Sequence, residues 1–187
     1  MAVTLEYVKT LIECPDITVF SDQKNALLVT VPHRGELVLL TIALTDGGDY
    51  LRYCIPYYLS LPNAIDPNRL LVKLLELNRN LKLFKFGCDP LDGEVSVSIE
   101  VALENAKPTR WQVERCLHAL TGYALEERDR LRSMMTTGIY PESSDVNFTD
   151  TLDRLFAGYQ APTEEELPES TAVSVPSKRF EPDFEEE

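Results

Sequence analysis

Apolar residues along this chain follow two periods, one of about 3.6 residues and one of two, and the changes between them divide it into eight elements. Helical spacing begins after three residues that can cap a helix, Thr4, Asp66 and Thr109. Strand-like composition or alternation fills five runs, which are 26–34, 36–45, 49–61, 81–89 and 93–103. The predicted order of elements is therefore α-β-β-β-α-β-β-α.

Short connections predict how the strand runs pair. Arg34-Gly35, residues 46–49 and residues 90–93 contain the Gly, Asp and Pro that are typical of tight turns between antiparallel neighbours. We therefore expect an α+β fold in which an antiparallel sheet is packed by helices. The chain has 187 residues, of which 44% are hydrophobic, and we expect residues 1–140 to form one domain.

The stretch LLELNRNLKLFKFG, residues 74–87, changes from helical to strand spacing at a polar triplet, Asn78-Arg79-Asn80. The triplet is consistent with a site for an anion or a nucleotide, or with the corner where a helix meets a sheet. Asn tolerates the left-handed conformation that ends many helices, and its polar group can satisfy the last carbonyls. These properties favour the corner, and a binding role for Arg79 stays open.

The runs 36–45 and 49–61 are apolar on both faces, unlike the run 93–103, in which Val and Ile alternate with Ser and Glu. Either helices cover both faces or one face meets another chain, because large exposed apolar patches mark interaction sites. We favour intermolecular burial over a simple core. The predicted partner-binding residues are Leu37, Leu39, Tyr50, Cys54 and Tyr58.

Periodicity is lost from Pro141 onward, where Pro, Ser, Thr and Glu dominate. Residues 141–187 contain 13 Asp and Glu but 3 Lys and Arg, a net charge of −10, and we expect a mostly disordered acidic tail. The segment 148–159 is the exception, because helical spacing relates its four apolar residues, Leu152, Leu155, Phe156 and Tyr159. Our hypothesis is that this amphipathic segment covers the partner-binding strands. The alternative is a solvated tail with an incidental apolar cluster.

The sequence shows no pattern of residues typical of an active site. Its two histidines and four cysteines lack metal-ligand spacing, and no phosphate-binding glycine motif or nucleophile motif is present. We expect no catalytic residues, no cofactor and no metal, and reduced core thiols. Lys and Arg do not cluster as nucleic-acid binding requires, and no apolar stretch approaches the length of a membrane span. We therefore expect a cytoplasmic protein that binds neither nucleic acid nor membranes.

The element order, the pattern ELNRN…FG…DGEV and the closing helix opened by KPTRWQVERCLHAL resemble the YbjN family and the type III secretion chaperone-like fold over about residues 1–140. This resemblance implies a compact α+β domain, often dimeric, that binds segments of other proteins without catalysis. By analogy it also implies a homodimer, for which Leu71 and Leu75 would face inward. The expected interface is then Leu70, Lys73, Leu74 and Leu77.

These observations lead to one main functional hypothesis. The protein is predicted to be a non-enzymatic binding module, chaperone-like or regulatory, that binds segments of a partner protein through an apolar surface. The first alternative is a fixed subunit of a larger complex, in which the apolar strands form a permanent interface. The second is an enzyme, which would require a polar pocket with converging titratable groups.

Overall fold

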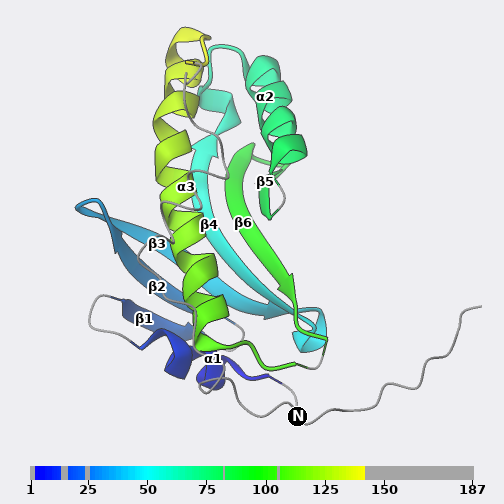
Figure 1. Ribbon diagram of the computed structural model, residues 1–187. Coiled ribbons are helices and arrows are strands. Elements are labelled where there is room, and N and C mark those ends of the chain that lie inside the picture. Colours follow the sequence, from blue (N-terminus) through cyan, green and yellow to red (C-terminus); the bar gives the residue numbers. More distant parts are fainter. Residues whose placement is uncertain (1–2, 14–16, 24–25, 82, 105, 142–187) are drawn as a thin grey trace, which may run out of the picture.

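The structure is a computed structural model that describes residues 3–13, 17–23, 26–81, 83–104 and 106–141. In this part of the chain, three helices pack with one six-stranded sheet (Figure 1). The elements are α1 (Leu5–Ile12), β1 (Thr18–Gln23), β2 (Ala26–His33), β3 (Glu36–Thr45), β4 (Tyr50–Ser60), α2 (Pro67–Asn80), β5 (Phe84–Cys88), β6 (Glu94–Ala102) and α3 (Arg110–Thr137). The α+β class is therefore confirmed. The predicted tail segment 148–159 lies outside the described residues.

All strand pairs are antiparallel, and the strand order is β1-β2-β3-β4-β6-β5. The sequence prediction lacked β1, so the element order contains one strand more than expected. This strand is short, ends in the polar residues Ser21, Asp22 and Gln23, and has an irregular register after Val19. An edge strand needs neither strict alternation nor two apolar faces, which explains why periodicity did not reveal it.

One row of side chains crosses five strands and forms the centre of the core. Each member is at most 1% exposed, so the row is excluded from water along its whole length. The row consists of Leu27, Ile42, Tyr53, Ile99 and Phe84. α3 runs across this face of the sheet (Figure 1) and buries Val113, Leu117 and Leu120. Burial of each large apolar side chain contributes roughly 1.5–3 kcal/mol.

The opposite face of the middle strands is less apolar than predicted. Arg52 of β4 forms an ion pair with Glu100 of β6, and its guanidinium lies 3.9 Å from the sulfur of Cys54. Cys54 stands beside Thr41 and Ser98, which are small and polar. The second face of β4 is therefore apolar only in part, because Arg52 stands in the middle of the strand and Cys54 has polar neighbours on β3 and β6.

The polar joint at the end of α2 is a structural corner, as predicted. The Asn78 amide donates to the carbonyl of Phe86 over 2.9 Å and accepts from its N–H over 2.7 Å. Asn78 thus satisfies two backbone groups of the edge strand β5. The expected left-handed conformation is wrong, because neither Asn78 nor Asn80 has a positive φ and the helix ends at Leu81 in an extended conformation.

The orientation of α2 is the reverse of the predicted one. Leu70 and Leu74 are 0% and 2% exposed, whereas Leu71, Val72 and Leu75 are 37%, 64% and 60% exposed. The two apolar stripes of this helix lie on different sides, and the spacing alone did not tell which of them faces the core. Packing against α3 and β5 selects the first stripe.

Candidate functional site

Strands β3 and β4 pair along only part of their length. Their ladder extends from Thr45 opposite Tyr50 to Thr41 opposite Cys54, whereas the first half of β3 pairs with β2 alone. The next position of β4 that would face β3 is Pro56, which has no N–H to donate. The ladder therefore ends before this proline, and Figure 1 shows that β3 and β4 diverge along part of their length.

The open half of β3 has backbone groups that could pair with another strand. Alternate residues direct their N–H and C=O to opposite neighbours. The two-residue turn Arg34-Gly35 makes Glu36 a hydrogen-bonded partner of β2, so Leu37 and Leu39, like Thr41, are directed to the other side. In the part of the chain that the structure describes, no strand pairs with these two residues on that side. The result is a short unpaired edge inside the sheet.

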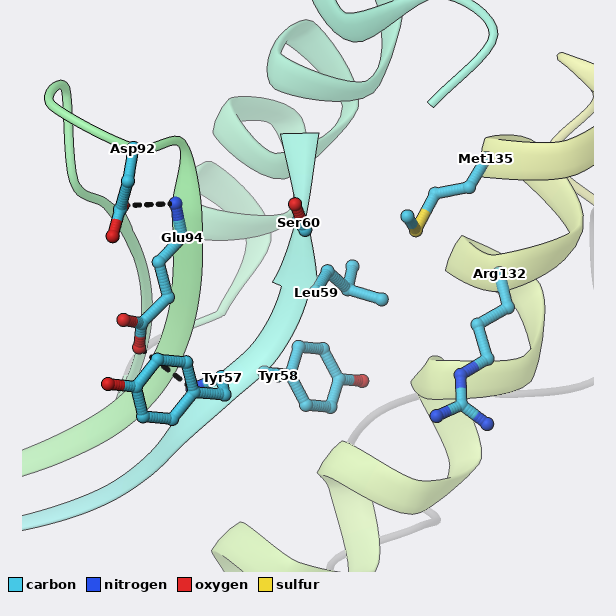
Figure 2. Close-up of a pocket in the computed structure, with 8 residues that line it drawn as sticks. All are labelled: Tyr57, Tyr58, Leu59, Ser60, Asp92, Glu94, Arg132 and Met135. Carbon is cyan, nitrogen blue, oxygen red and sulfur yellow. Dashed lines mark hydrogen bonds between the residues drawn. The ribbon is translucent and has the colours of Figure 1, made fainter. Parts of the chain in front are cut away.

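A bulge shapes the opposite side of the opening. The register of β4 against β6 shifts between Ile55 and Leu59, and Tyr57 has a positive φ of 51°. The Tyr57 N–H donates to the Glu94 carboxylate over 2.8 Å instead of joining the ladder. Figure 2 shows the consequence, because Tyr57 and Tyr58 point to opposite sides of the strand. Tyr57 is 80% exposed and Tyr58 is 6% exposed.

Residues from three elements form a groove in this opening. α3 provides its floor, and β3 and β4 provide the two sides. A hollow of about 210 Å³ is lined by Leu37, Val38, Leu39, Ile55, Pro56, Tyr57, Tyr58, Ala124, Leu125, Arg128 and Arg132. An adjoining hollow of about 350 Å³ shares three of these residues and extends to Leu59, Ser60, Asp92, Glu94 and Met135 (Figure 2). We call the two hollows together the β3–β4 groove.

Charged groups are placed at the rim of the groove. Arg128 of α3 donates to both carboxylate oxygens of Glu36, at 3.0 and 2.8 Å, and Arg34 at the β2–β3 turn donates to Glu126 over 2.7 Å. These two ion pairs join the end of the hairpin to α3. Arg132 extends from α3 into the groove toward Tyr58 (Figure 2). The floor of the groove therefore carries positive charge.

The carboxylates at the far end of the groove accept hydrogen bonds from backbone N–H groups. Asp92 accepts from the N–H of Glu94 over 2.8 Å, and Glu94 accepts from the N–H of Tyr57. Gly93 between them has a φ of 72°, and a side chain there would come within 2.6 Å of Pro62. The residues 89–94 thus form a tight turn that holds the bulge of β4.

Burial keeps the described thiols protonated near neutral pH. It raises the pKa of Cys116 to about 11, and it also raises the pKa of Cys54. Burial lowers the pKa of both His33 and His118. Among the described residues, no cluster of His, Cys, Asp or Glu has the geometry of a metal site, and no helix is long and apolar enough to span a membrane. The three described cysteines, Cys54, Cys88 and Cys116, are free thiols.

The predicted partner-binding residues fall into two groups. Leu37, Leu39 and Tyr58 line the groove, although Tyr58 does so as a buried wall and not as an exposed side chain. The expected exposure of Tyr58 is wrong, because the bulge exchanges its orientation with that of Tyr57. Tyr50 lies at the other end of β4, opposite Ala102, and the exposure expected for Cys54 is also wrong, because Cys54 is buried.

The predicted dimer-interface residues are not available at the surface as a set. Leu70 and Leu74 belong to the core, and Leu77 packs against it. Lys73 is half-buried, with its ammonium 4.0 Å from the centre of the Tyr140 ring. Burial of the two leucines against their own domain is the physical reason why this interface prediction is wrong.

Several residues of the groove were absent from the sequence prediction. Pro56 was a usable signal, because a proline inside a strand run marks an edge or a bulge. Arg128 and Arg132 are spaced i, i+4 and therefore share one side of α3. Their proximity to β4 depends on tertiary packing, which no local pattern contains.

No protein-family model matches the chain, and no curated protein matches it. Among solved structures, the chain is similar to a chain of the HopA1–SchA chaperone–effector complex, with 17% identity and a TM-score of 0.44 over 66% of this chain and 88% of that one. It is also similar to YbjN from E. coli, with 15% identity and a TM-score of 0.44 over 72% and 91%.

Proposed function

We propose that this protein is a non-enzymatic binding module that takes an extended segment of a partner protein into the β3–β4 groove. The observation that supports the proposal is the unpaired edge of β3 beside an apolar groove. An added strand would pair with the backbone of Leu37 and Leu39, and its alternate side chains would enter the groove. Strand addition of this kind gives affinity through backbone hydrogen bonds and specificity through side-chain pockets.

The lining of the groove indicates the chemistry of the bound segment. Leu37, Leu39 and Pro56 would contact apolar side chains that point into the groove. Arg132 would attract an acidic side chain or a carbonyl oxygen at the position nearest to α3. A segment that alternates aliphatic residues with polar ones, with one acidic residue, fits this surface best.

Two features of the described residues support a binding role over catalysis. The carboxylates of Asp92 and Glu94 accept hydrogen bonds from backbone N–H groups, which occupies them structurally. Burial raises the pKa of Cys54 and thereby disfavours the nucleophilic thiolate. The location in the cytoplasm and the homodimer are further proposals, and the homodimer no longer has its predicted interface. Light scattering at tens of micromolar protein would test the dimer.

Peptide selection would test the proposed function. Random 12-residue peptides displayed on phage are selected on the full-length protein, and one selected peptide is labelled for fluorescence anisotropy. Leu39→Glu should weaken its binding at least about tenfold, which corresponds to about 1.4 kcal/mol. Leu91→Glu is the matched control, because Leu91 is almost fully exposed on the turn 89–94, and it should leave binding unchanged.

A second variant examines the backbone pairing. Single proline substitutions are made along the selected peptide. Proline should abolish binding where the replaced residue donates its N–H to β3, and it should be tolerated at the neighbouring positions, whose N–H groups point away from β3. Equal affinity for the wild-type protein and for Leu39→Glu would contradict the proposal. So would the failure to select any peptide that binds below 100 micromolar, a threshold of about 5–6 kcal/mol. A permanently bound partner that copurifies with the protein would favour the fixed-subunit alternative.

A further inference from the structure

α2 carries a second apolar surface, and no residue of this helix lines the groove. Leu71, Val72 and Leu75 are exposed on the side of the helix that points away from Leu70 and Leu74. Arg79 follows Leu75 by four residues and is exposed on the same side. We call Leu71, Val72, Leu75 and Arg79 the outer face of α2.

The last described residues of the chain are fastened beside this helix. The Tyr140 hydroxyl donates to the Glu127 carboxylate of α3, and the ammonium of Lys73, on α2, lies over the Tyr140 ring. The chain therefore passes α2 at Pro141, with eleven residues to go before Leu152 is reached. Eleven residues span up to about 36 Å, which exceeds the diameter of one helix, about 10–12 Å.

The segment 148–159 matches the outer face in pattern and charge. Its four apolar residues would form one stripe on a helix, and such a short helix is marginal in water without a surface to cover it. The segment also contains Asp150 and Asp153, which carry the charge opposite to that of Arg79. An amphipathic helix on an exposed helical face is an established mode of recognition.

We propose that residues 148–159 dock as a helix on the outer face of α2. A second copy of the chain is the less suitable occupant, because three aliphatic side chains offer on the order of 300 Å², whereas a stable interface buries about 800 Å² on each partner. A tethered segment needs less area, since a short linker gives an effective concentration in the millimolar range.

The groove is also a less suitable place for this segment. Glu127, which holds Tyr140, and Arg132, which lines the groove, are five residues apart and therefore lie about 140° apart around α3. The chain leaves the described domain on the side of α2, away from the groove. Docking on α2 would leave the groove open for a partner, so that the two surfaces act independently.

Amide exchange followed by mass spectrometry on the full-length protein tests the proposal. Amides of 148–159 should exchange about tenfold more slowly than those of an unstructured peptide, a value expected for a weak contact at millimolar effective concentration. The double substitution Val72→Glu and Leu75→Glu should abolish this protection, and Arg79→Glu should reduce it about threefold. Leu91→Glu is the control and should leave it unchanged.

Reciprocal variants complete the test. Leu155→Glu with Phe156→Glu should abolish the protection of 148–159. Unprotected amides in the wild-type segment would overturn the proposal. Protection that survives the α2 variants but is lost in Leu39→Glu would place the segment in the groove. If light scattering shows a dimer that becomes a monomer in the variant with Val72→Glu and Leu75→Glu, the outer face is instead an interface between two copies.

Discussion

Two opposite sides of α3, at the same level along its axis, differ in how they are covered and in the charges they carry. On one flank, Glu127 and Arg130 lie beside Tyr140 at the end of the described chain, and Tyr123 packs on Phe84 of β5. We call this the closed flank. On the other, Leu125, Arg128 and Arg132 face the opening between β3 and β4, and we call this the open flank. The closed flank contains a buried carboxylate, whereas the open flank contains two cations that line the groove.

The closed flank shows what a buried charge requires. Glu127 is 4% exposed and accepts from the Tyr140 hydroxyl, while Arg130 lies 3.6 Å from its second oxygen. Burial still raises the pKa of Glu127, and the Tyr140 hydrogen bond and the cations Arg130 and Lys73 oppose that rise. A charge deep in the fold thus needs several partners from different elements.

The open flank exists because a strand stops pairing. Pro56 withholds a donor from β3, and the left-handed Tyr57 turns β4 away toward Glu94. The same apolar sequence would otherwise continue a closed sheet over α3. A single missing donor and a bulge therefore convert core-like strands into the walls of a groove.

The largest expected effect distinguishes the packing of the two flanks. Tyr123→Ala removes a ring that lies 4.7 Å from Phe84 and should lower the free energy of unfolding by about 3–5 kcal/mol. Leu37→Ala, on the exposed wall of the open flank, should change it by less than about 0.5 kcal/mol. Urea unfolding followed by circular dichroism measures both. Equal losses would mean that the open flank is packed as tightly as the closed one.

The second prediction concerns pH and the closed flank. Because the pKa of Glu127 is raised in the folded state, the folded protein binds more protons, and stability falls as pH rises from about 4 through the raised pKa. Glu127→Gln removes this slope and keeps an acceptor for Tyr140. The stability of the variant relative to wild type should therefore increase with pH, as measured by urea unfolding between pH 4 and pH 8.

Glu104→Gln is the control for that series, because Glu104 is exposed, and its difference from wild type should stay constant with pH. A constant difference for Glu127→Gln as well would show that burial does not shift this carboxylate. The Glu127 carboxylate would then be more accessible to water than the packing of the closed flank indicates.

The third prediction concerns the end of the β3–β4 ladder on the open flank. Pro56→Val restores a donor opposite Leu39, so the β3–β4 ladder should extend by one pair. The amide at position 56 should exchange at least about tenfold more slowly than an unstructured amide, with a change in stability within about 1 kcal/mol. Amide exchange by NMR measures the protection. Pro90→Val, on an exposed turn, is the control, and its new amide should exchange like an unstructured one. Unprotected exchange at position 56 would mean that the bulge, and not the proline, ends the ladder.

The smallest expected effect concerns the rim of the open flank. Arg128→Met removes the ion pair with Glu36 but preserves most of the apolar stem, and it should cost about 0.2–1 kcal/mol at low salt. The cost should shrink in 0.5 M NaCl because exposed charges are screened. A cost that is independent of salt would indicate that the side chain acts through packing.

Local signals predicted most of the secondary structure. Thr4, Asp66 and Thr109 accept hydrogen bonds from the first turns of the three helices, and Thr109 and Gln112 form a capping box. The turns at Arg34-Gly35 and at 90–93 lie between antiparallel strands as expected. These features depend on residues a few positions apart, and a sequence displays such neighbours directly.

The groove could be predicted only in part. Leu37 and Leu39 were selected because they are apolar on the second face of a strand, and both line the groove. The same reasoning selected Tyr58 as an exposed residue, but a bulge shifts the alternation by one position there. A bulge depends on the partner strand and on Glu94, so alternation within β4 could not reveal it.

The sequence by itself determined the caps, the turns and the apolar periods, because each depends on residues that are only a few positions apart in the chain. Tertiary structure decided which stripe of α2 faces the core, where β3 and β4 separate, and which groups surround Glu127. Leu70 and Leu75 are equally apolar, and the free energy that separates them comes from area buried against α3 and β5. That area exists only after distant elements have met, which is why no pattern along the chain could assign it.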